Sequence, residues 1–117
     1  MLLALCALSC AVTPRPTASP LLGHWRSDNN RGQIGEYVFQ ADGTFRGSVT
    51  SNGAVLAKFT GVWSLRDGVI NYEYRSDAIG NIAPGTKDQD KLLEVSPEKY
   101  TIEAADGSRR IYVRVRS

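Results

Sequence analysis

The sequence predicts an all-β fold, an eight-stranded antiparallel up-and-down barrel that follows an N-terminal signal segment. From Leu21 onward, apolar residues recur at every second position, which is the period of half-buried strands. Turn signals built from Gly, Asp, Asn or Pro separate these runs at a spacing of roughly ten residues. No window shows a helical period. Because a meander of eight strands leaves two free edges, closure into a barrel is the expected way to remove them.

The first twenty residues are interpreted as a signal and a tether. Met1 to Cys10 is almost wholly apolar, yet it falls short of the roughly 20 residues that a membrane span needs. The run Ala7-Leu8-Ser9-Cys10 resembles a bacterial lipobox. That resemblance implies that residues 1–9 are a signal peptide, that Cys10 receives a diacylglyceryl group, and that residues 10–20 are a flexible tether. An ordinary secretory signal and a cytosolic chain with an apolar end are the alternatives.

Residues 21–117 form the predicted barrel domain, and the turns divide it into strands. Asp42-Gly43, Asp67-Gly68 and Asp106-Gly107 are hairpin signals, since Gly accepts positive φ without a steric penalty. Further turns are expected at Asn52-Gly53 and at Ser96-Pro97-Glu98. The stretch from Ala78 to Asp90 is interpreted as a loop. The expected strands are 21–27, 34–41, 44–51, 54–66, 69–77, 90–95, 98–105 and 109–116.

Alternation also predicts which side chains face the interior. The final strand is expected to turn its arginines outward, as a solvated face. The predicted inner set is mostly aromatic and aliphatic: Tyr37, Phe39, Phe45, Val49, Val55, Ala57, Phe59, Gly61, Trp63, Leu65, Ile70, Tyr72, Tyr74, Leu93, Val95, Tyr100, Ile102, Ile111, Val113 and Val115. The predicted wet face of the last strand consists of Arg109, Arg110, Arg114 and Arg116.

These inner residues allow two interpretations of the barrel interior. An eight-stranded barrel is just wide enough for side chains or one small ligand, and so many aromatic rings favour a filled core. However, buried Tyr hydroxyls need hydrogen-bond partners. An open end lined by Tyr37, Tyr72, Tyr74 and Tyr100 is therefore the candidate ligand pocket.

Three segments carry a family resemblance: Gly23-His24-Trp25, Gly61-Val62-Trp63-Ser64-Leu65, and the ending from Asp106 to Arg114. Together they resemble small lipocalin-like domains of the calycin type, many of which are bacterial lipoproteins. The resemblance spans Leu21 to Arg116. It implies that a terminal arginine, Arg114 or Arg116, packs across Trp25 as a structural plug, with the ligand entrance at the opposite end.

Composition argues against several classes of function. The 14 basic and 12 acidic residues give a net charge of +2 and form no block, so no nucleic-acid partner is expected. Both cysteines, Cys6 and Cys10, precede the barrel, which leaves no thiolate for a disulfide or a zinc site in it. The single histidine, His24, falls on the polar face, and Asp77, Asp88 and Asp90 are interpreted as solvated residues rather than cation ligands.

The sequence therefore predicts a non-enzymatic, monomeric binding module without metal or cofactor. It is expected to be exported and lipid-anchored, on the periplasmic side of the outer membrane or on the cell surface. Its partner is expected to be a small ligand or an envelope protein. The alternative is an envelope enzyme inhibitor, of the protease or lysozyme inhibitor type, that inserts residues 11–20 into its target.

Overall fold

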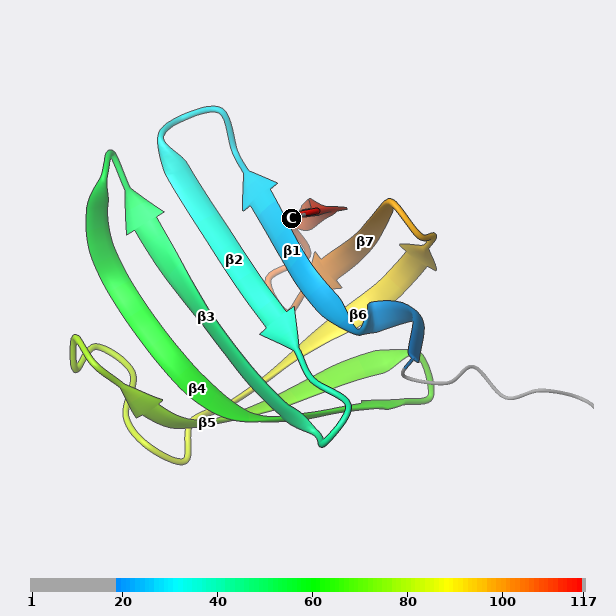
Figure 1. Cartoon of the computed structure of the whole chain (residues 1–117), viewed down its shortest axis with the longest axis horizontal. Coiled ribbons are helices and arrows are strands. Elements are labelled where there is room, and N and C mark those ends of the chain that lie inside the picture. Colours follow the sequence, from blue (N-terminus) through cyan, green and yellow to red (C-terminus); the bar gives the residue numbers. More distant parts are fainter. Residues whose placement is uncertain (1–18, 117) are drawn as a thin grey trace, which may run out of the picture.

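The computed structural model describes residues 19–116, which form a closed barrel of antiparallel strands (Figure 1). Each strand pairs with its neighbour in sequence, and β8 returns to pair with β1. The elements are η1 (Ser19–Leu21), β1 (Gly23–Asp28), β2 (Gln33–Phe39), β3 (Thr44–Ser51), β4 (Ala54–Arg66), β5 (Val69–Asp77), β6 (Lys87–Val95), β7 (Lys99–Ala104) and β8 (Arg109–Arg114). The predicted all-β, up-and-down class is confirmed.

The N-terminal predictions fall almost entirely outside the described residues. The signal peptide, Cys10 and most of the tether belong to residues 1–18. Two tether residues, Ser19 and Pro20, lie in the 3-10 turn η1 together with Leu21. Leu21 is fully buried in the core, so it begins the packed domain as part of η1 rather than as the predicted start of a strand. No helix within residues 19–116 is long and apolar enough to span a membrane.

The hairpin turns lie at the predicted positions. In the β3–β4 turn, Asn52 and Gly53 have φ of 50° and 86°, and in the β4–β5 turn Asp67 and Gly68 have φ of 53° and 76°. Two successive residues with positive φ match the right-handed twist of the flanking strands. These local signals thus fix the register of their hairpins, because a tight turn leaves the flanking strands one way to pair.

The sixth strand begins earlier than predicted. Residues 87–89 were expected in a loop, but Lys87, Asp88 and Gln89 pair with Glu73, Tyr72 and Asn71 of β5. As a result Asp90 lies mid-strand with its side chain buried, and the expectation that it is solvated in a loop is wrong. A run of charged and polar residues on both faces carries no period-2 hydrophobic signal, so only pairing with β5 identifies it as a strand.

In two strands, β8 and β6, the side chains that point into the barrel differ from the predicted ones. In β8 the inward residue is Tyr112, at 4% exposure, whereas Ile111 and Val113 are 52% and 54% exposed. Tyr112 pairs with Tyr100 across the β7–β8 ladder, and their rings stack with centroids 4.8 Å apart. The inward assignment of Ile111, Val113 and Val115 is therefore wrong: the first two face outward in β8 and the third lies beyond the strand. Their neighbours Arg110 and Arg114 share the inward side of β8 with Tyr112, contrary to the predicted wet face.

In β6 the inward residues are one position out of step with the predicted alternation, because Leu92 shares the side of the buried Asp90. Leu92 rather than Leu93 packs against the core. Val95, predicted inside, is exposed near the end of the barrel, and Val55 is exposed at the start of β4. A register shift follows between Leu92 and Glu94 and brings Val95 opposite the inward Tyr100, although the Val95 side chain is 38% exposed.

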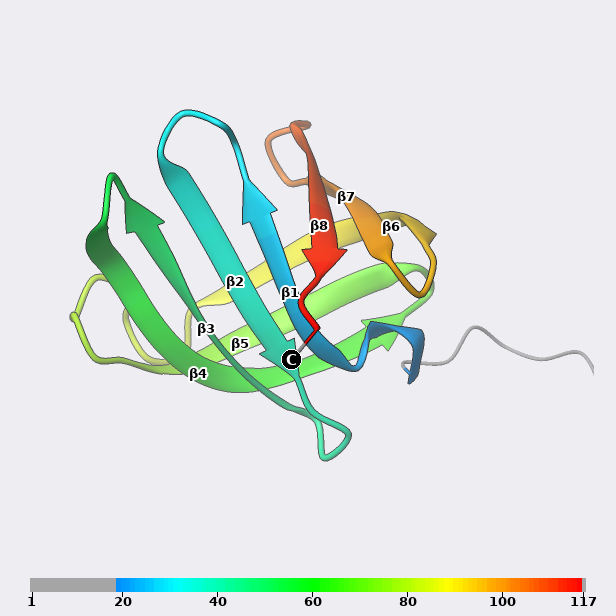
Figure 2. The ribbon, with the colours of Figure 1, turned by 45° about the horizontal axis from the view of Figure 1, so that its top comes forward.

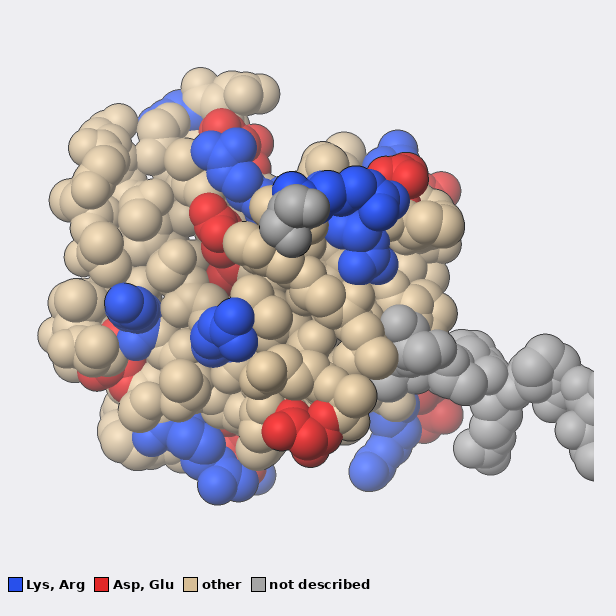
Figure 3. Space-filling view, viewed as in Figure 1, with Lys and Arg blue, Asp and Glu red and all other residues tan. Residues whose placement is uncertain are grey.

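Aromatic rings fill the middle of the barrel. Tyr37 lies at the centre, and its ring centroid is 5.5 to 6.1 Å from those of Phe39, Phe45, Phe59, Tyr72 and Tyr112. The spacing is that of favourable tilted and edge-on aromatic pairs. Apart from Asp90, the charged side chains among the described residues are not buried, and Figure 3 shows the two signs interspersed over one face of the molecule. The interior is thus a packed core that can admit a ligand only toward an end.

Candidate functional site

One end of the barrel is sealed by a stack of Arg114 on Trp25. The guanidinium carbon of Arg114 lies 4.1 Å from the centroid of the Trp25 ring, within the range of a cation–π contact. Trp25 is fully buried, and its indole Nε1 donates to the carbonyl oxygen of Leu21 at 2.8 Å. The structure thus places Arg114 where the sequence analysis expected the plug, and Arg116 lies outside the stack.

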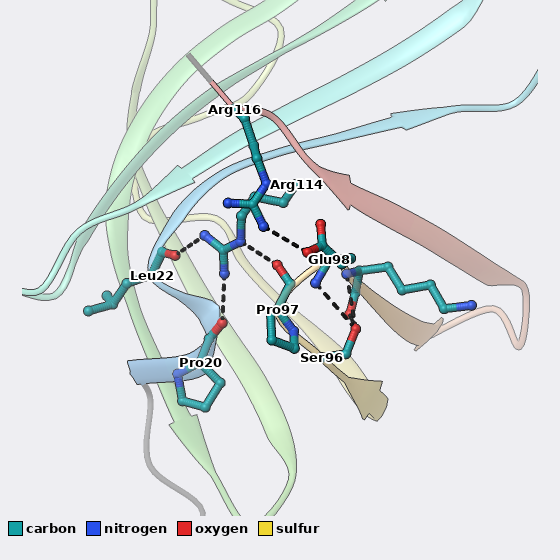
Figure 4. Close-up of polar contacts among 8 residues, drawn as sticks. Pro20, Leu22, Ser96, Pro97, Glu98, Arg114 and Arg116 are labelled. Carbon is teal, nitrogen blue, oxygen red and sulfur yellow. Dashed lines mark hydrogen bonds and ion pairs between the residues drawn. The ribbon is translucent and has the colours of Figure 1, made fainter.

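Backbone carbonyls hold the Arg114 guanidinium flat against that ring. Figure 4 shows it between the segment that leads into β1 and the β6–β7 turn. Its nitrogens donate to the carbonyl oxygens of Pro97 at 2.6 Å, Leu22 at 2.8 Å and Pro20 at 3.2 Å. Gly23 lies directly beneath, with φ of 117°, and a Cβ there would collide with Nη1 of Arg114. The glycine of the G-x-W segment is therefore required by the arginine.

Arg114→Ala is expected to lower the free energy of unfolding by about 2 kcal/mol or more. The change removes a cation–π contact worth about 0.5 to 2 kcal/mol together with hydrogen bonds from a charged donor. Arg116→Ala is the matched control, because Arg116 makes a single exposed ion pair with Glu98, which contributes about 0 to 1 kcal/mol. Urea unfolding of both variants measures the difference, and equal losses would show that Arg114 is not the plug.

The four tyrosines predicted as ligand residues all contribute to the barrel interior. Tyr72, Tyr74 and Tyr100 are buried, and Tyr37 packs against the core. The Tyr37 and Tyr74 hydroxyl oxygens lie 3.4 Å apart, and the Tyr72 hydroxyl donates to Oδ2 of Asp90 at 2.9 Å. The Tyr100 hydroxyl is buried without a hydrogen-bond partner within residues 19–116. All four tyrosines therefore lie in the barrel interior, but their hydroxyl groups differ in their hydrogen-bond partners.

A fifth inward tyrosine, Tyr112, escaped the sequence analysis. The flanking Ile111 and Val113 are more hydrophobic than Tyr112, so alternation assigned them to the interior and placed Tyr112 on the outer face. Burial raises the pKa of Tyr112 to about 12, and it raises the pKa of Tyr37, Tyr72 and Tyr100 well above the usual value. All four hydroxyls therefore stay protonated and able to donate at neutral pH.

Asp90 places a carboxyl group among these hydroxyls. It is 8% exposed, and burial raises its pKa while the hydrogen bond from Tyr72 opposes that effect. A raised pKa in the folded state means that the protonated form is favoured there. The contribution of Asp90 to stability is therefore fully present below its unfolded pKa and is lost as pH rises through its folded pKa.

Asp90→Asn is accordingly expected to remove the loss of stability that occurs as pH rises. The difference in unfolding free energy between variant and parent should grow in favour of the variant as pH rises above about 4, the unfolded pKa of Asp. Urea unfolding across the acidic range measures it. Glu94→Gln is the control for loss of one carboxylate from β6, since Glu94 lies on the same strand but is exposed, and it should track the parent. Asp88 is unsuitable as a control, because its charge also raises the pKa of Asp90. If the Asp90 difference stays constant with pH, the buried carboxyl does not titrate as described.

The other end of the barrel has a cleft between β1 and β8. The two strands pair only at Trp25 with Arg114 and at Arg26 with Val113. Figure 2 shows them diverging from there toward the β1–β2 and β7–β8 turns. The resulting cleft has a volume of about 620 Å³. Its lining comes from both ends of the chain: Ser27, Asn29, Arg31, Gln33, Gly35, Tyr37, Val49, Ser108, Arg109, Arg110 and Tyr112.

The cleft reaches two of the interior tyrosines. The hydroxyl oxygen of Tyr112 lies 4.0 Å from the position that a Cβ on Gly35 would occupy. Glycine at this position keeps the space beside the hydroxyl open. Tyr37 and Tyr112 thus join the packed core to the cleft, whereas Tyr72, Tyr74 and Tyr100 do not line it.

The histidine and the acidic residues among residues 19–116 do not assemble a metal site. His24 lies on the outer surface, where its Nε2 is 2.7 Å from Oε1 of Glu36. No group of three or more His, Cys, Asp or Glu side chains in this range could hold a metal ion. The cleft itself offers hydrogen-bond donors, from the side chains of Arg31, Arg109, Arg110 and Tyr112.

Comparison with known proteins supports the fold. No protein family model matches the chain, and no curated protein matches it. Among solved structures, the chain is similar to a lipocalin-like protein from Bacteroides uniformis, with a TM-score of 0.61 and 19% sequence identity. The match covers 82% of this chain and 99% of that one. The barrel described here is thus lipocalin-like in fold.

Proposed function

We propose that this lipocalin-like barrel is a non-enzymatic binding module that takes a small ligand into the β1–β8 cleft. The observation that carries the proposal is the asymmetry of the two ends. At one end Arg114 and the buried Trp25 leave no entrance. At the other, a cleft of about 620 Å³ leads to the hydroxyl of Tyr112. This volume lies within the usual range for small-molecule sites.

Native mass spectrometry of the protein purified without denaturation tests this function. The proposal expects a population that carries a bound small molecule and loses it on denaturation. Gly35→Leu is the matched variant, because a side chain at this position would grow into the cleft beside Tyr112. A folded Gly35→Leu protein should lose the bound species. Retention of the same species by that variant, or no bound species and no binding of any added probe, would contradict the proposal.

We further propose that the module is a lipoprotein of the cell envelope, anchored through Cys10. The support is the run Ala7-Leu8-Ser9-Cys10 and the stretch that follows it, in which three of residues 11–20 are Pro and two are Thr. η1 and the sealed end lie directly after this stretch. An anchor there would place the cleft at the far end of the barrel, away from the lipid.

Cys10→Ser is expected to move the protein from the membrane fraction to the soluble fraction. One acyl chain alone binds a membrane only marginally, so firm anchoring needs more than one. Cys6→Ser is the matched control, because Cys6 belongs to the same apolar run but does not end the lipobox-like segment. Fractionation followed by immunoblotting measures the outcome. Unchanged membrane retention of the Cys10 variant would contradict lipid anchoring through Cys10.

The inhibitor alternative has no specific support in the described residues. Of residues 11–20, which would insert into a target enzyme, only Ser19 and Pro20 are described, and both lie in η1. The carbonyl of Pro20 accepts a hydrogen bond from Arg114. This end of the segment is thus held against the barrel.

A further inference from the structure

The β1–β8 cleft is lined by three arginines and by no aspartate or glutamate. Arg31 comes from the β1–β2 turn, and Arg109 and Arg110 come from the start of β8. Within residues 19–116, none of the three lies within 4 Å of a carboxylate oxygen, whereas Arg26, Arg75 and Arg116 all make ion pairs. Unpaired guanidinium groups that share a concave surface raise the local concentration of anions.

Arg110 is the innermost of these arginines. It pairs with the buried Ile102 in the β7–β8 ladder and lies two residues before the inward Tyr112. Its side chain is therefore on the barrel side of β8, while Arg109, one residue earlier, is on the outer side at the rim. A ligand that passes the rim of the cleft would contact Arg110 and the Tyr112 hydroxyl.

Four aspartates lie near the cleft without lining it: Asp28, Asp88, Asp90 and Asp106. Asp28 is ion-paired with Arg26, and Asp106 accepts hydrogen bonds from the cleft residue Ser108. Asp90 is buried, accepts a hydrogen bond from Tyr72 and interacts electrostatically with Arg110. Asp88 pairs opposite Tyr72 on β6. Neither lines the cleft. The three guanidinium groups line the cleft and none of these carboxylates does, so the charge at the cleft surface favours an anion.

On this basis, and resting on the function proposed above, we propose that the ligand is a small soluble organic anion, held through its carboxylate or phosphate by Arg110. Arg31 and Arg109 supply the attracting charge at the rim. Guanidinium groups bind such oxyanions through paired, charge-assisted hydrogen bonds. The Tyr112 hydroxyl is placed to donate a further one, and the rings of Tyr37 and Tyr112 offer an apolar surface to the rest of the molecule.

A series of probes that differ only in charge tests the inference. Benzoate, benzyl alcohol and benzylammonium are titrated against the full-length protein, and binding is followed by amide chemical shifts in NMR spectra. Benzoate should bind at least tenfold more tightly than the other two, and its affinity should weaken as salt rises. The largest shifts should fall on residues of the cleft. If the neutral or the cationic probe binds in the cleft as tightly as benzoate or more tightly, the inference that the ligand is an anion is overturned. The proposed binding function then still stands.

Arg110→Gln and Arg46→Gln provide a matched pair of variants. Both remove one positive charge, but Arg46 lies on the outer face of β3 and does not line the cleft. Arg110→Gln should weaken benzoate binding by a factor of about 10 to 100, because a charge-assisted hydrogen bond is lost. Arg110→Lys should restore part of the affinity, and Arg46→Gln should change it less than about threefold. Equal affinity of the two Gln variants overturns the assignment of Arg110.

A lipid headgroup offers the same chemistry as a soluble anion, so vesicles form the second arm. Sedimentation with phosphatidylglycerol vesicles is compared with sedimentation with phosphatidylcholine vesicles, using the parent and Arg110→Gln. The proposal expects no difference that depends on Arg110. Arg110-dependent binding to the anionic vesicles without binding of benzoate or inorganic phosphate overturns the soluble ligand and assigns the cleft to a membrane surface.

Discussion

Trp25→Ala is expected to unfold the barrel or bring it close to unfolding. Truncation of a buried Trp costs about 3 to 5 kcal/mol, and domains of this size have a total stability of about 5 to 15 kcal/mol. Trp25 is fully buried, and its ring meets that of Tyr100 edge-on, with centroids 4.8 Å apart. Its loss also removes the surface on which Arg114 stacks. Circular dichroism during urea and thermal unfolding measures the effect.

Trp25→Phe provides the control for this prediction. A phenyl ring still offers a face to the Arg114 guanidinium, but it cannot donate to the carbonyl of Leu21 as the indole does. The Phe variant should therefore lose clearly less stability than the Ala variant. If Trp25→Ala melts within a few degrees of the parent, which corresponds to about 1 kcal/mol in a domain of this size, the sealed end does not stabilise the fold as argued.

Gly61→Ala is expected to be nearly as damaging, although it adds a single methyl group. A Cβ at this position would collide with the carbonyl oxygen of Glu73 and lie 2.7 Å from Cε1 of Phe45. Phe45 pairs with Gly61 across the β3–β4 ladder and is 1% exposed, so its ring has no free space to move into. Overpacking of this kind costs about 1 to 3 kcal/mol, occasionally more, and we expect the upper part of that range.

Gly35→Ala is the matched control for Gly61→Ala. Gly35 also lies mid-strand, but the nearest atom to its added Cβ is the Tyr112 hydroxyl oxygen at 4.0 Å, an ordinary contact. Its stability should stay within about 0.5 kcal/mol of the parent, as is usual for changes that create no clash. Equal losses from the two variants would show that the loss at Gly61 comes from backbone effects of replacing glycine and not from the ring of Phe45.

The sequence by itself determined the fold class, the turns and most of the interior. Those features depend on local signals: an Asp-Gly or Asn-Gly pair selects a hairpin, and period-2 alternation selects a buried face wherever only one face is apolar. Closure of the two edge strands of the meander also predicted that Trp25 lies near Arg114 or Arg116, and the lipocalin-like resemblance implied that one of these arginines stacks on it.

Tertiary structure alone decided the facing of β8, the start of β6 and the cleft. In β8 both faces offer apolar side chains, with Tyr112 on one and Ile111 and Val113 on the other, so alternation cannot choose between them. The choice is made by the pairing of Tyr112 with Tyr100 and of Arg114 with Trp25. That same register turns Arg110 inward, toward a cleft that exists only because β1 and β8 part beyond Arg26. Local sequence carries no signal for the point at which two strands from opposite ends of the chain stop pairing, since that point depends on the closure of the whole barrel.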